Sequence, residues 1–315
     1  MVKKILVGLI ALLAVLFGVA AAMNRLAPTT TAKLLRDMSR SAAGLHAKTL
    51  EVQGRTFPYL AGGTGEPLIL VHGFTANKDA WGRVARYLTS RYTVYALDLP
   101  GFGDASRNPN ADYSYDAQVE NLHAFIKGLG LASVHLGGSS MGGGVVAKYA
   151  AKYPNEVASL WLLDAGATRE FTDSALMKHY IFTGEFPLLV KTQDQQAKQW
   201  EMLFGKPLFI PYSVAYDFLE NSKKDFDFHS KILKDMVAVK APIESLFSNL
   251  QTPTLIVTGE QDQIVPPASV RTLAKVFPKS QVKVMAGVGH VPMTEDPKTT
   301  AEDYLAFRAT LSKAP

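Results

Sequence analysis

A serine in the middle of a glycine-rich pentapeptide is the first residue of the sequence that could carry out covalent chemistry. Residues 138–142 read Gly-Ser-Ser-Met-Gly and have the spacing Gly-x-Ser-x-Gly around Ser140. A run of β-type residues, 133–137, precedes them, and a helical pattern over 143–153 follows. In such a strand-turn-helix unit the serine has strained backbone angles, and glycines let the neighbouring backbone pass without a Cβ clash. Ser140 is therefore a candidate nucleophile.

A serine hydroxyl is a poor nucleophile at neutral pH and needs a base, which in turn needs an acid to orient it. Of the seven histidines, only His290 follows the last predicted strand in a glycine-flanked loop, from which it can reach over the strand ends. Asp262 lies in the loop after the preceding strand and would hold the imidazole in the productive tautomer. Asp164 follows the strand before that and is the alternative acid, with Asp262 then a turn residue.

The charge that develops on a substrate oxygen needs preorganised hydrogen-bond donors. We expect these to be the backbone N–H groups of Met141, next to the candidate nucleophile, and of Phe74, after an apolar run that ends in Val-His-Gly. His72 in that run is assigned to fixing the loop. The other histidines, His46, His123, His135, His179 and His229, are assigned to the surface or to packing. No clustered pattern of histidines and carboxylates stands out, so we expect neither a metal nor a cofactor.

The elements that must position these residues alternate between strands and helices. The predicted strands are two within 48–61 and six apolar runs at 67–71, 92–97, 133–137, 157–163, 253–258 and 281–285. Helical patterns separate the later runs, which predicts right-handed βαβ crossovers. We therefore predict an α/β fold with a mostly parallel eight-stranded sheet and helices on both faces. Active sites in such sheets lie at the carboxyl ends of the strands, where Ser140, Asp262 and His290 all fall.

The alternation stops at about residue 168 and resumes at about residue 253. The intervening stretch holds 13 of the 31 aromatic residues in about a quarter of the chain. We predict a mainly helical cap, or lid, over 168–248, inserted into a core formed by 48–167 and 249–315. Most of these aromatic side chains should form the core of the cap, and together they could line an apolar channel.

The N-terminal segment is apolar and uncharged from residue 5 to residue 23, close to the roughly 20 residues that a membrane-spanning helix needs. We assign 1–24 to a retained transmembrane anchor, because the run is longer than the ~7–15 apolar residues of a signal peptide. Three alanines at 20–22 nevertheless resemble a signal-peptidase site. Two lysines precede the segment and four basic residues follow it, a count that by itself would place the domain in the cytoplasm.

Residues 25–47 predict a juxtamembrane amphipathic helix, with its regular pattern over 31–47. Its apolar face contains Leu34, Leu35, Met38, Ala42 and Leu45, and its polar face contains Lys33, Arg36, Asp37 and Arg40. After a membrane span, such a helix suits an anionic lipid surface. Packing against the globular domain is the alternative, and the pattern does not distinguish the two.

The overall composition bounds the class of protein. The chain has 315 residues, 47% of them hydrophobic, which is enough for one large domain with an insertion. The formal net charge is +5, but no basic stripe with interleaved aromatic residues is present, so we expect no nucleic-acid partner. The absence of cysteine excludes disulfides, a thiolate nucleophile and cysteine-ligated metals.

Taken together, these motifs resemble the α/β-hydrolase superfamily over residues 48–315. The segments that carry the resemblance are 68–74, 98–103, 138–142, 259–266 and 289–297. The order serine, aspartate, histidine along the chain is that of this superfamily's triad. Within it, the chain is similar to bacterial family V lipases and membrane-anchored phospholipase A relatives. Soluble carboxylesterases and C–C bond hydrolases have a similar strand-turn-helix unit around the serine, called the nucleophile elbow. It often reads Gly-Asn-Ser where this chain has Gly-Ser-Ser, and these enzymes lack the anchor.

The resemblance implies Ser140 as nucleophile with Asp262 and His290 as its partners. It also implies a single-pass protein of the bacterial inner membrane with a periplasmic catalytic domain, and dimerisation through the anchor helix. We therefore expect a membrane-anchored serine hydrolase that cleaves acyl esters of glycerophospholipids through an acyl-enzyme, as a lipase or phospholipase A. A carboxylesterase or C–C bond hydrolase acting on small soluble substrates is the alternative. A non-catalytic binding protein on this fold is the third class.

Overall fold

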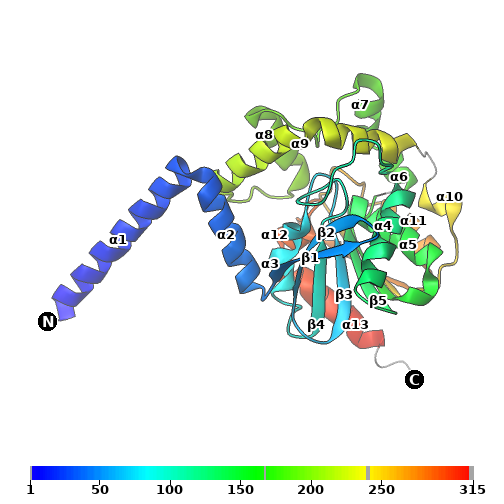
Figure 1. Cartoon of the computed structure of the whole chain (residues 1–315), viewed down its shortest axis with the longest axis horizontal. Coiled ribbons are helices and arrows are strands. Elements are labelled where there is room, and N and C mark those ends of the chain that lie inside the picture. The colour runs from blue at the N-terminus through cyan, green and yellow to red at the C-terminus, as the bar shows by residue number, and fades with distance from the viewer. Residues whose placement is uncertain (1, 167, 239–241, 312–315) are drawn as a thin grey trace.

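The fold is built around one sheet that separates two layers of helices (Figure 1). The computed structural model describes residues 2–166, 168–238 and 242–311. The strands are β1 (His46–Val52), β2 (Arg55–Gly62), β3 (Glu66–Val71), β4 (Tyr92–Leu97), β5 (Val134–Ser139), β6 (Val157–Leu163), β7 (Thr254–Gly259) and β8 (Ser280–Met285). Their order in the sheet is β1-β2-β4-β3-β5-β6-β7-β8. Strand β2 runs antiparallel to both of its neighbours and all other neighbouring pairs are parallel, which confirms the predicted sheet.

Successive side chains of the central strands enter two different cores, because strand residues alternate between faces. In β3, Ile69 and Val71 pack on one side, and Leu68 and Leu70 pack on the other. The first side is covered by α4 (Tyr115–Gly128), α5 (Met141–Lys152) and α11 (Ser269–Val276). The second is covered by η1 (Lys78–Trp81), α3 (Gly82–Ala85), α12 (Pro292–Glu295) and α13 (Pro297–Leu311). A short turn, η2 (Pro154–Glu156), leads into β6.

Most of the described chain between β6 and β7 is helical, as the aromatic stretch predicts. They are α6 (Arg169–Thr172), α7 (Ala175–Thr183), α8 (Gln193–Leu203), α9 (Tyr212–Ala238) and α10 (Ile243–Leu246). A capping box between Thr192 and Gln195 starts α8. Figure 1 shows α7, α8 and α9 gathered over one end of the sheet. The predicted core boundary at residue 167 and the last residues, 312–315, fall outside the described residues, and the division of the chain into a core and a cap stays a prediction.

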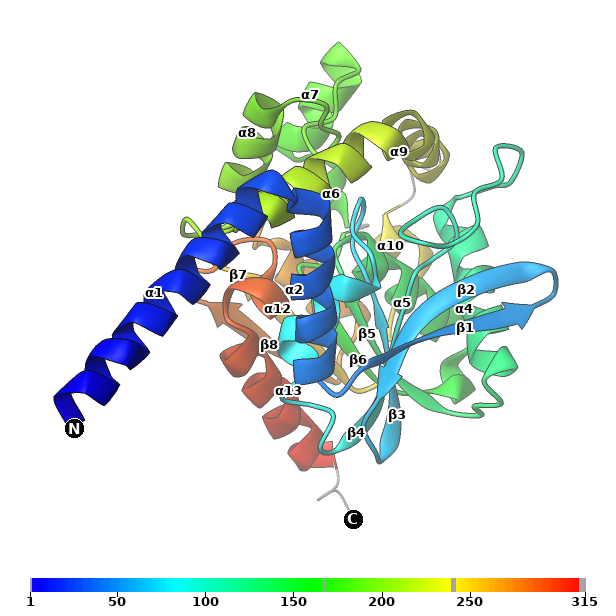
Figure 2. The ribbon, with the colours of Figure 1, turned by 60° about the vertical axis from the view of Figure 1, so that its left-hand side comes forward.

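The N-terminal helix α1 (Val2–Leu26) projects away from the globular body (Figure 2). Its window Leu9–Leu26 has a mean hydropathy of 2.1 and none of it is buried, so length and composition suit a membrane span. Its last residues contact the start of α9, where the Asn24 side chain accepts a hydrogen bond from the Ser213 N–H at 2.9 Å. The guanidinium of Arg25 lies 4.3 Å from the centre of the Tyr212 ring.

The predicted helix over 31–47 is wrong at its C-terminal end. Helix α2 (Pro28–Ala42) begins with a proline at a first-turn position, where the missing N–H costs nothing, and stops five residues early. Gly44 has φ 65°, a left-handed conformation that ends helices, and β1 begins at His46. Leu45 is therefore a buried core residue and not part of an amphipathic face.

Helix α2 contacts the globular body through its polar side. The Arg40 guanidinium donates two hydrogen bonds to Asp79, at 2.6 and 2.7 Å, and Arg36 lies 3.5 Å from Asp217 in α9. Leu34 and Met38, from the predicted apolar face, are 50% and 59% exposed. The helix therefore packs on the body, as the alternative interpretation expects, and still presents apolar side chains outwards.

Candidate active site

Ser140 lies at the apex of the sharp turn between β5 and α5. Its backbone angles are φ 54° and ψ −117°, a strained conformation for a residue with a side chain. A Cβ on Gly138 would lie 2.3 Å from the Gly142 oxygen, and a Cβ on Gly142 would lie 2.3 Å from the Val71 oxygen. Glycine at these two positions is therefore a steric requirement of the turn, as the pentapeptide predicts.

Backbone hydrogen bonds hold this turn against the end of β6. The Ser140 N–H donates to the Leu163 oxygen at 2.9 Å. The Ser140 carbonyl accepts from Gly144 at 3.1 Å and from Gly166 at 3.0 Å. Because β6 and α5 both fix the turn, the serine has little freedom to relax from its strained angles.

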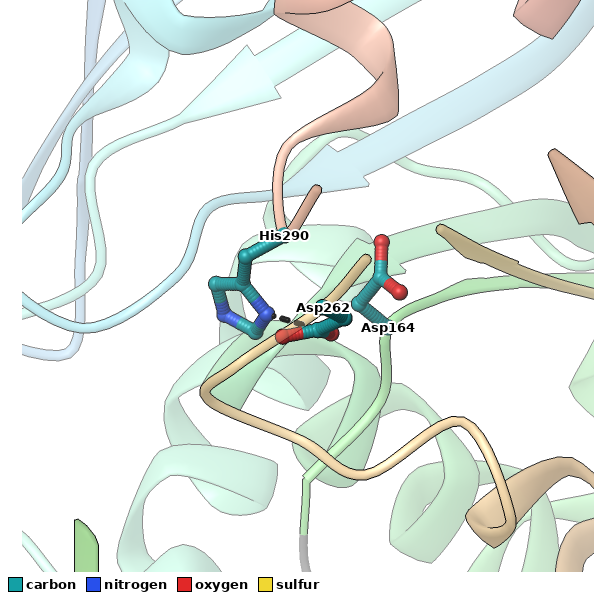
Figure 3. Close-up of side chains that lie close together, drawn as sticks. All are labelled: Asp164, Asp262 and His290. Atoms are coloured by element: carbon teal, nitrogen blue, oxygen red, sulfur yellow. Dashed lines mark hydrogen bonds and ion pairs between the residues drawn. The ribbon is translucent and has the colours of Figure 1, made fainter. Parts of the chain in front are cut away.

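His290 and Asp262 form a buried pair at the ends of β7 and β8 (Figure 3). The His290 Nδ1 lies 2.8 Å from Asp262 Oδ2. Asp262 Oδ1 accepts hydrogen bonds from the backbone of Ile264 at 2.8 Å and Val265 at 3.0 Å. Burial opposes the charged carboxylate, but the charge and hydrogen bond of His290, together with the other hydrogen bonds to the carboxylate, outweigh it and hold the pKa of Asp262 below its usual value. This is the arrangement of a base and the acid that orients it.

Asp164, the alternative acid, bonds to other groups. Its Oδ1 accepts from the Thr258 hydroxyl at 2.8 Å and from the Gly259 N–H at 2.9 Å. The geometry thus favours Asp262 over Asp164 as the partner of His290. One donor atom from each of Asp164, Asp262 and His290 lies within 4.8 Å of the others, a donor set that could also hold a metal ion.

Ser140 lies in the wall of a cavity of about 420 Å³. The two predicted oxyanion donors, Phe74 and Met141, line the same cavity. Gly73 brings the Phe74 loop close to the elbow, because a Cβ on Gly73 would lie only 3.3 Å from the Ser140 Cβ. Much of the remaining wall comes from apolar residues of α7, α9 and the segments beside them, including Met177, Phe186, Leu188, Leu233 and Met236.

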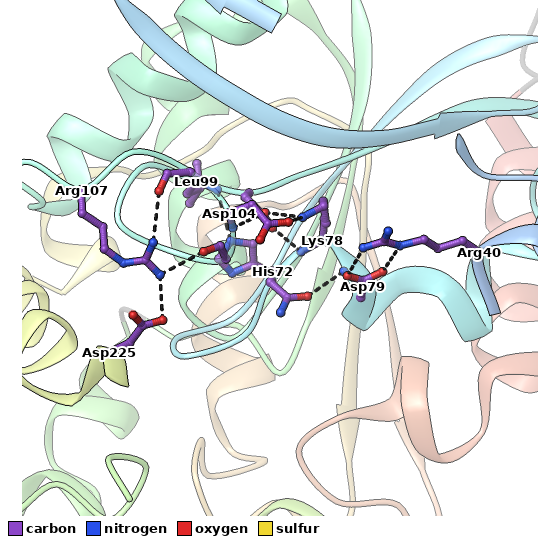
Figure 4. Close-up of polar contacts among 12 residues, drawn as sticks. Arg40, His72, Lys78, Asp79, Leu99, Asp104, Arg107 and Asp225 are labelled. Atoms are coloured by element: carbon purple, nitrogen blue, oxygen red, sulfur yellow. Dashed lines mark hydrogen bonds and ion pairs between the residues drawn. The ribbon is translucent and has the colours of Figure 1, made fainter. Parts of the chain in front are cut away.

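The Phe74 loop is fixed by His72, as its assignment to the loop predicts (Figure 4). The Nδ1 of His72 bonds to the Gly73 oxygen at 2.8 Å, and Nε2 accepts from the Leu99 N–H at 3.2 Å. Nδ1 therefore carries the proton and the ring is neutral. Burial lowers the pKa of His72 and maintains this state.

A buried ion pair behind this loop was not predicted from the sequence. Lys78 Nζ lies 2.6 Å from Asp98 Oδ2 and 2.6 Å from Asp104 Oδ2. The Lys78 N–H also donates to Asp98 Oδ1 at 2.7 Å. The pair joins η1, which follows the Phe74 loop, to the glycine-rich loop after β4. The signal available in the sequence was the aspartate that opens that loop, but nothing local indicated its partner.

Glu295 is a second residue that the sequence did not single out. Its Oε1 accepts from the Gly289 N–H at 2.9 Å, and its Oε2 accepts from the Gly205 N–H at 2.8 Å. The His290 N–H in turn donates to the Leu203 oxygen at 2.8 Å. The histidine loop is therefore bonded directly to the end of α8. The sequence segment after His290 includes this glutamate, but nothing in the sequence indicated which groups it would contact.

Comparisons with known proteins agree with this geometry. The family model described as the alpha/beta hydrolase fold matches residues 66–209 and 205–297. The chain belongs to the α/β-hydrolase family. Its sequence is 38% identical over 305 residues to Lipase 1 of Psychrobacter immobilis, covering 93% of each chain. It is also 38% identical over 321 residues to Lipase 3 of Moraxella sp. (strain TA144), covering 97% of this chain and 98% of that one.

A solved structure extends the similarity to the whole chain. The crystal structure of a membrane phospholipase A, described as a bacterial virulence factor, matches with a TM-score of 0.88 and 34% identity. The match covers 99% of this chain and 100% of that one. Together with the family and the lipase relatives, it identifies the chain as an ester hydrolase, and the resemblance read from the motifs is confirmed.

Proposed function

We propose that the chain is a membrane-anchored serine hydrolase that cleaves acyl esters of glycerophospholipids, with Ser140, Asp262 and His290 as its catalytic residues. The observation that supports this most is the strained Ser140 in the wall of a cavity, with a hydrogen-bonded aspartate–histidine pair that follows β7 and β8 of the same sheet. The lipases and the phospholipase A among its relatives support the substrate class.

The mechanism follows from the roles that each group can take. His290 accepts the Ser140 proton through Nε2 as the serine oxygen attacks the ester carbonyl, and Asp262 stabilises the imidazolium. The backbone N–H groups of Phe74 and Met141 donate to the oxyanion. His290 then protonates the departing alcohol, which leaves an acyl-enzyme that water hydrolyses by the same steps. This sequence needs no cofactor.

The cavity suits an acyl chain. Its walls are mostly apolar, and each CH₂ group that moves from water into such an environment gains about 0.8 kcal/mol. A protein-lined cavity thereby offsets most of the cost of drawing an acyl chain out of a bilayer. Residues from the helical segment between β6 and β7 supply much of this wall, so we assign that segment the role of a cap over the acyl site.

We further propose that α1 is a single span in the bacterial inner membrane, with the catalytic domain in the periplasm. Helix α1 is long, apolar and unburied, and α2 exposes Leu34 and Met38 beside it. Membrane lipids would surround α1, and a second copy of the chain would be a partner through this helix. Tethering raises the local concentration of a lipid substrate.

Covalent labelling tests the catalytic assignment. A fluorophosphonate should label purified full-length protein in detergent micelles, because the Ser140 oxygen attacks phosphorus and displaces fluoride. Mass spectrometry should place the label on Ser140. Ser140→Ala should lose both labelling and ester hydrolysis, whereas Ser139→Ala, the neighbouring control, should keep the label.

Labelling that persists in Ser140→Ala would refute the nucleophile. A wild-type protein that neither takes the label nor hydrolyses esters would favour the non-catalytic binding class.

A further inference from the structure

A second aspartate lies beside the Asp262–His290 pair and is not used in the mechanism above. Asp164 follows β6 and is only 1% exposed. Its φ of 44° is in the left-handed region, which Asp and Asn tolerate better than most residues. Figure 3 shows its carboxyl group together with the side chains of Asp262 and His290.

The hydrogen bonds of the two carboxyl groups are unequal. Asp262 receives two backbone N–H groups on Oδ1 and the His290 ring on Oδ2. Asp164 receives the Thr258 hydroxyl and the Gly259 N–H, both on Oδ1. Its Oδ2 is shielded from water, and no hydrogen-bond donor within the described ranges reaches it. An ionised Asp164 would therefore leave a charged oxygen buried and unpaired.

Two neighbouring carboxyl groups in a buried site do not both ionise, because the second negative charge is repelled by the first and poorly solvated. The proton belongs on the group with fewer donors, which is Asp164. A proton on Oδ2 would also give this oxygen a hydrogen bond to donate, and Asp262 is the acceptor nearby, because oxygens of the two carboxyl groups lie within 4.8 Å of each other.

We propose that Asp164 is a neutral carboxylic acid that donates a hydrogen bond to the Asp262 carboxylate and is a positioning residue for the Asp262–His290 pair. The claim about catalysis rests on the proposed function, whereas the protonation state does not. The donated bond restricts rotation of the Asp262 side chain, and Asp262 in turn orients the imidazole.

The electrostatic surroundings agree with the geometry. Burial raises the pKa of Asp164 well above its usual value, and the charge of Asp262 and the hydrogen bond to it raise this pKa further. The bonds from Gly259 and Thr258 oppose the shift without cancelling it. The other titratable groups at this site are His290, in direct contact with Asp262, and Glu295, whose pKa is raised by burial and also by the charge of Asp262.

Infrared spectroscopy of the full-length protein in detergent, with isotope-labelled aspartate, measures the protonation state without any need for activity. At pH 7 the wild-type protein should show the C=O band of a buried protonated carboxylic acid. Asp164→Asn should lack this band. Asp227→Asn, a control with a side chain that is 96% exposed, should keep it. A wild-type spectrum without the band, or a band that persists in Asp164→Asn, would overturn the proposal.

Stability provides a second measurement independent of catalysis. An aspartate in an unfolded chain ionises near pH 3.9, so a protonated Asp164 takes up a proton when the protein folds at neutral pH. Stability is therefore lost as the pH rises above about 3.9 towards the folded pKa. Asp164→Asn removes this cost, and its Tm should exceed that of the wild type at pH 7 by more than at pH 5. An equal difference at both pH values would contradict a proton on Asp164.

Kinetic measurements test whether Asp164 positions the Asp262–His290 pair or only supports the fold. Asp164→Gly suits the left-handed backbone and removes the donor, and it should lower kcat by about 10- to 100-fold with little change in KM. Asp164→Asn should restore most of the rate, since its amide donates as the acid does.

An Asp164→Asn enzyme as slow as Asp164→Gly would overturn the positioning role. Loss of activity on chelation with EDTA, its return with Zn²⁺, and loss of Zn²⁺ binding in Asp164→Gly would together show that the three side chains bind a metal, and would overturn the proposal as well. A protonated Asp164 in a protein that hydrolyses no ester would instead leave the proton assignment in place and refute the proposed function.

Discussion

The Asp262 carboxylate holds its charge in a buried site because three N–H groups converge on it. Two come from the backbone of its own loop and one from the His290 ring. This fixes the rotamer of the aspartate and, through it, the tautomer of the histidine. Nε2 of His290 is then left free of the proton, as its proposed role as the base for Ser140 requires.

Substitution of Asp262 by Asn should abolish this control of the tautomer. Asp262→Asn keeps the shape of the side chain but presents an amide to Nδ1, so we expect kcat to fall by about 10⁴-fold. The measurement is steady-state hydrolysis of a soluble ester. A loss of this size in Asp164→Asn, with Asp262→Asn nearly normal, would transfer the acid role to Asp164.

At this scale the sequence predicted Asp262 as the acid, with Asp164 as the alternative, but it did not show the contact itself. Asp164 and Asp262 both follow core strands, and their spacing to His290 along the chain does not reveal which carboxylate meets the imidazole. The hydrogen bond from His290 to Asp262 distinguishes them. Ser140 was predictable because its turn requires glycines at fixed positions.

At the scale of elements, the loop that carries Phe74 is fixed between β3 and η1 by buried polar groups. His72 bonds to the loop and to Leu99 (Figure 4). Lys78 bonds to Asp98. In the proposed mechanism Phe74 donates to the oxyanion, and such a donor must be in place before the reaction for its full effect, so this rigidity would support that role. The ion pair between Arg40 and Asp79 links the same η1 to α2.

Lys78→Met should be strongly destabilising. It leaves the fully buried Asp98 without its cation, which typically costs about 3–5 kcal/mol. The measurement is the free energy of unfolding in urea. Lys127→Met is the matched control, because Lys127 pairs with Glu156 at 2.7 Å but is 46% exposed, and such pairs contribute at most about 1 kcal/mol. Equal losses in the two variants would contradict a structural role for the buried pair.

The strands and most helices were predictable because their apolar periodicity is local. The pairing of Lys78 with Asp98 and of Glu295 with Gly205 was not, because each contact joins distant segments with no repeating pattern. The early end of α2 was missed for a different reason. Its helical periodicity ran on past Gly44, and only the backbone conformation at that glycine ends the helix.

At the scale of the whole molecule, the structure joins three parts with different surfaces. The sheet and its helices bury a conventional core, the segment between β6 and β7 lines a mostly apolar cavity, and the Leu9–Leu26 part of α1 is unburied. The alternation of strands and helices predicted the first part. The polar contacts of α2 with the body were not predictable, because an amphipathic pattern normally buries the apolar face, whereas Leu34 and Met38 are exposed here.

Fatty acid release from phospholipid vesicles tests the central claim most directly. Full-length protein should release fatty acid from medium- or long-chain phospholipids, and Ser140→Ala should release none. A chain lacking residues 1–22, which retains Asn24 and its bond to Ser213, should hydrolyse p-nitrophenyl butyrate normally but act poorly on vesicles. Full-length protein that cleaves p-nitrophenyl butyrate yet releases no fatty acid from vesicles or mixed micelles would contradict the account and favour a carboxylesterase.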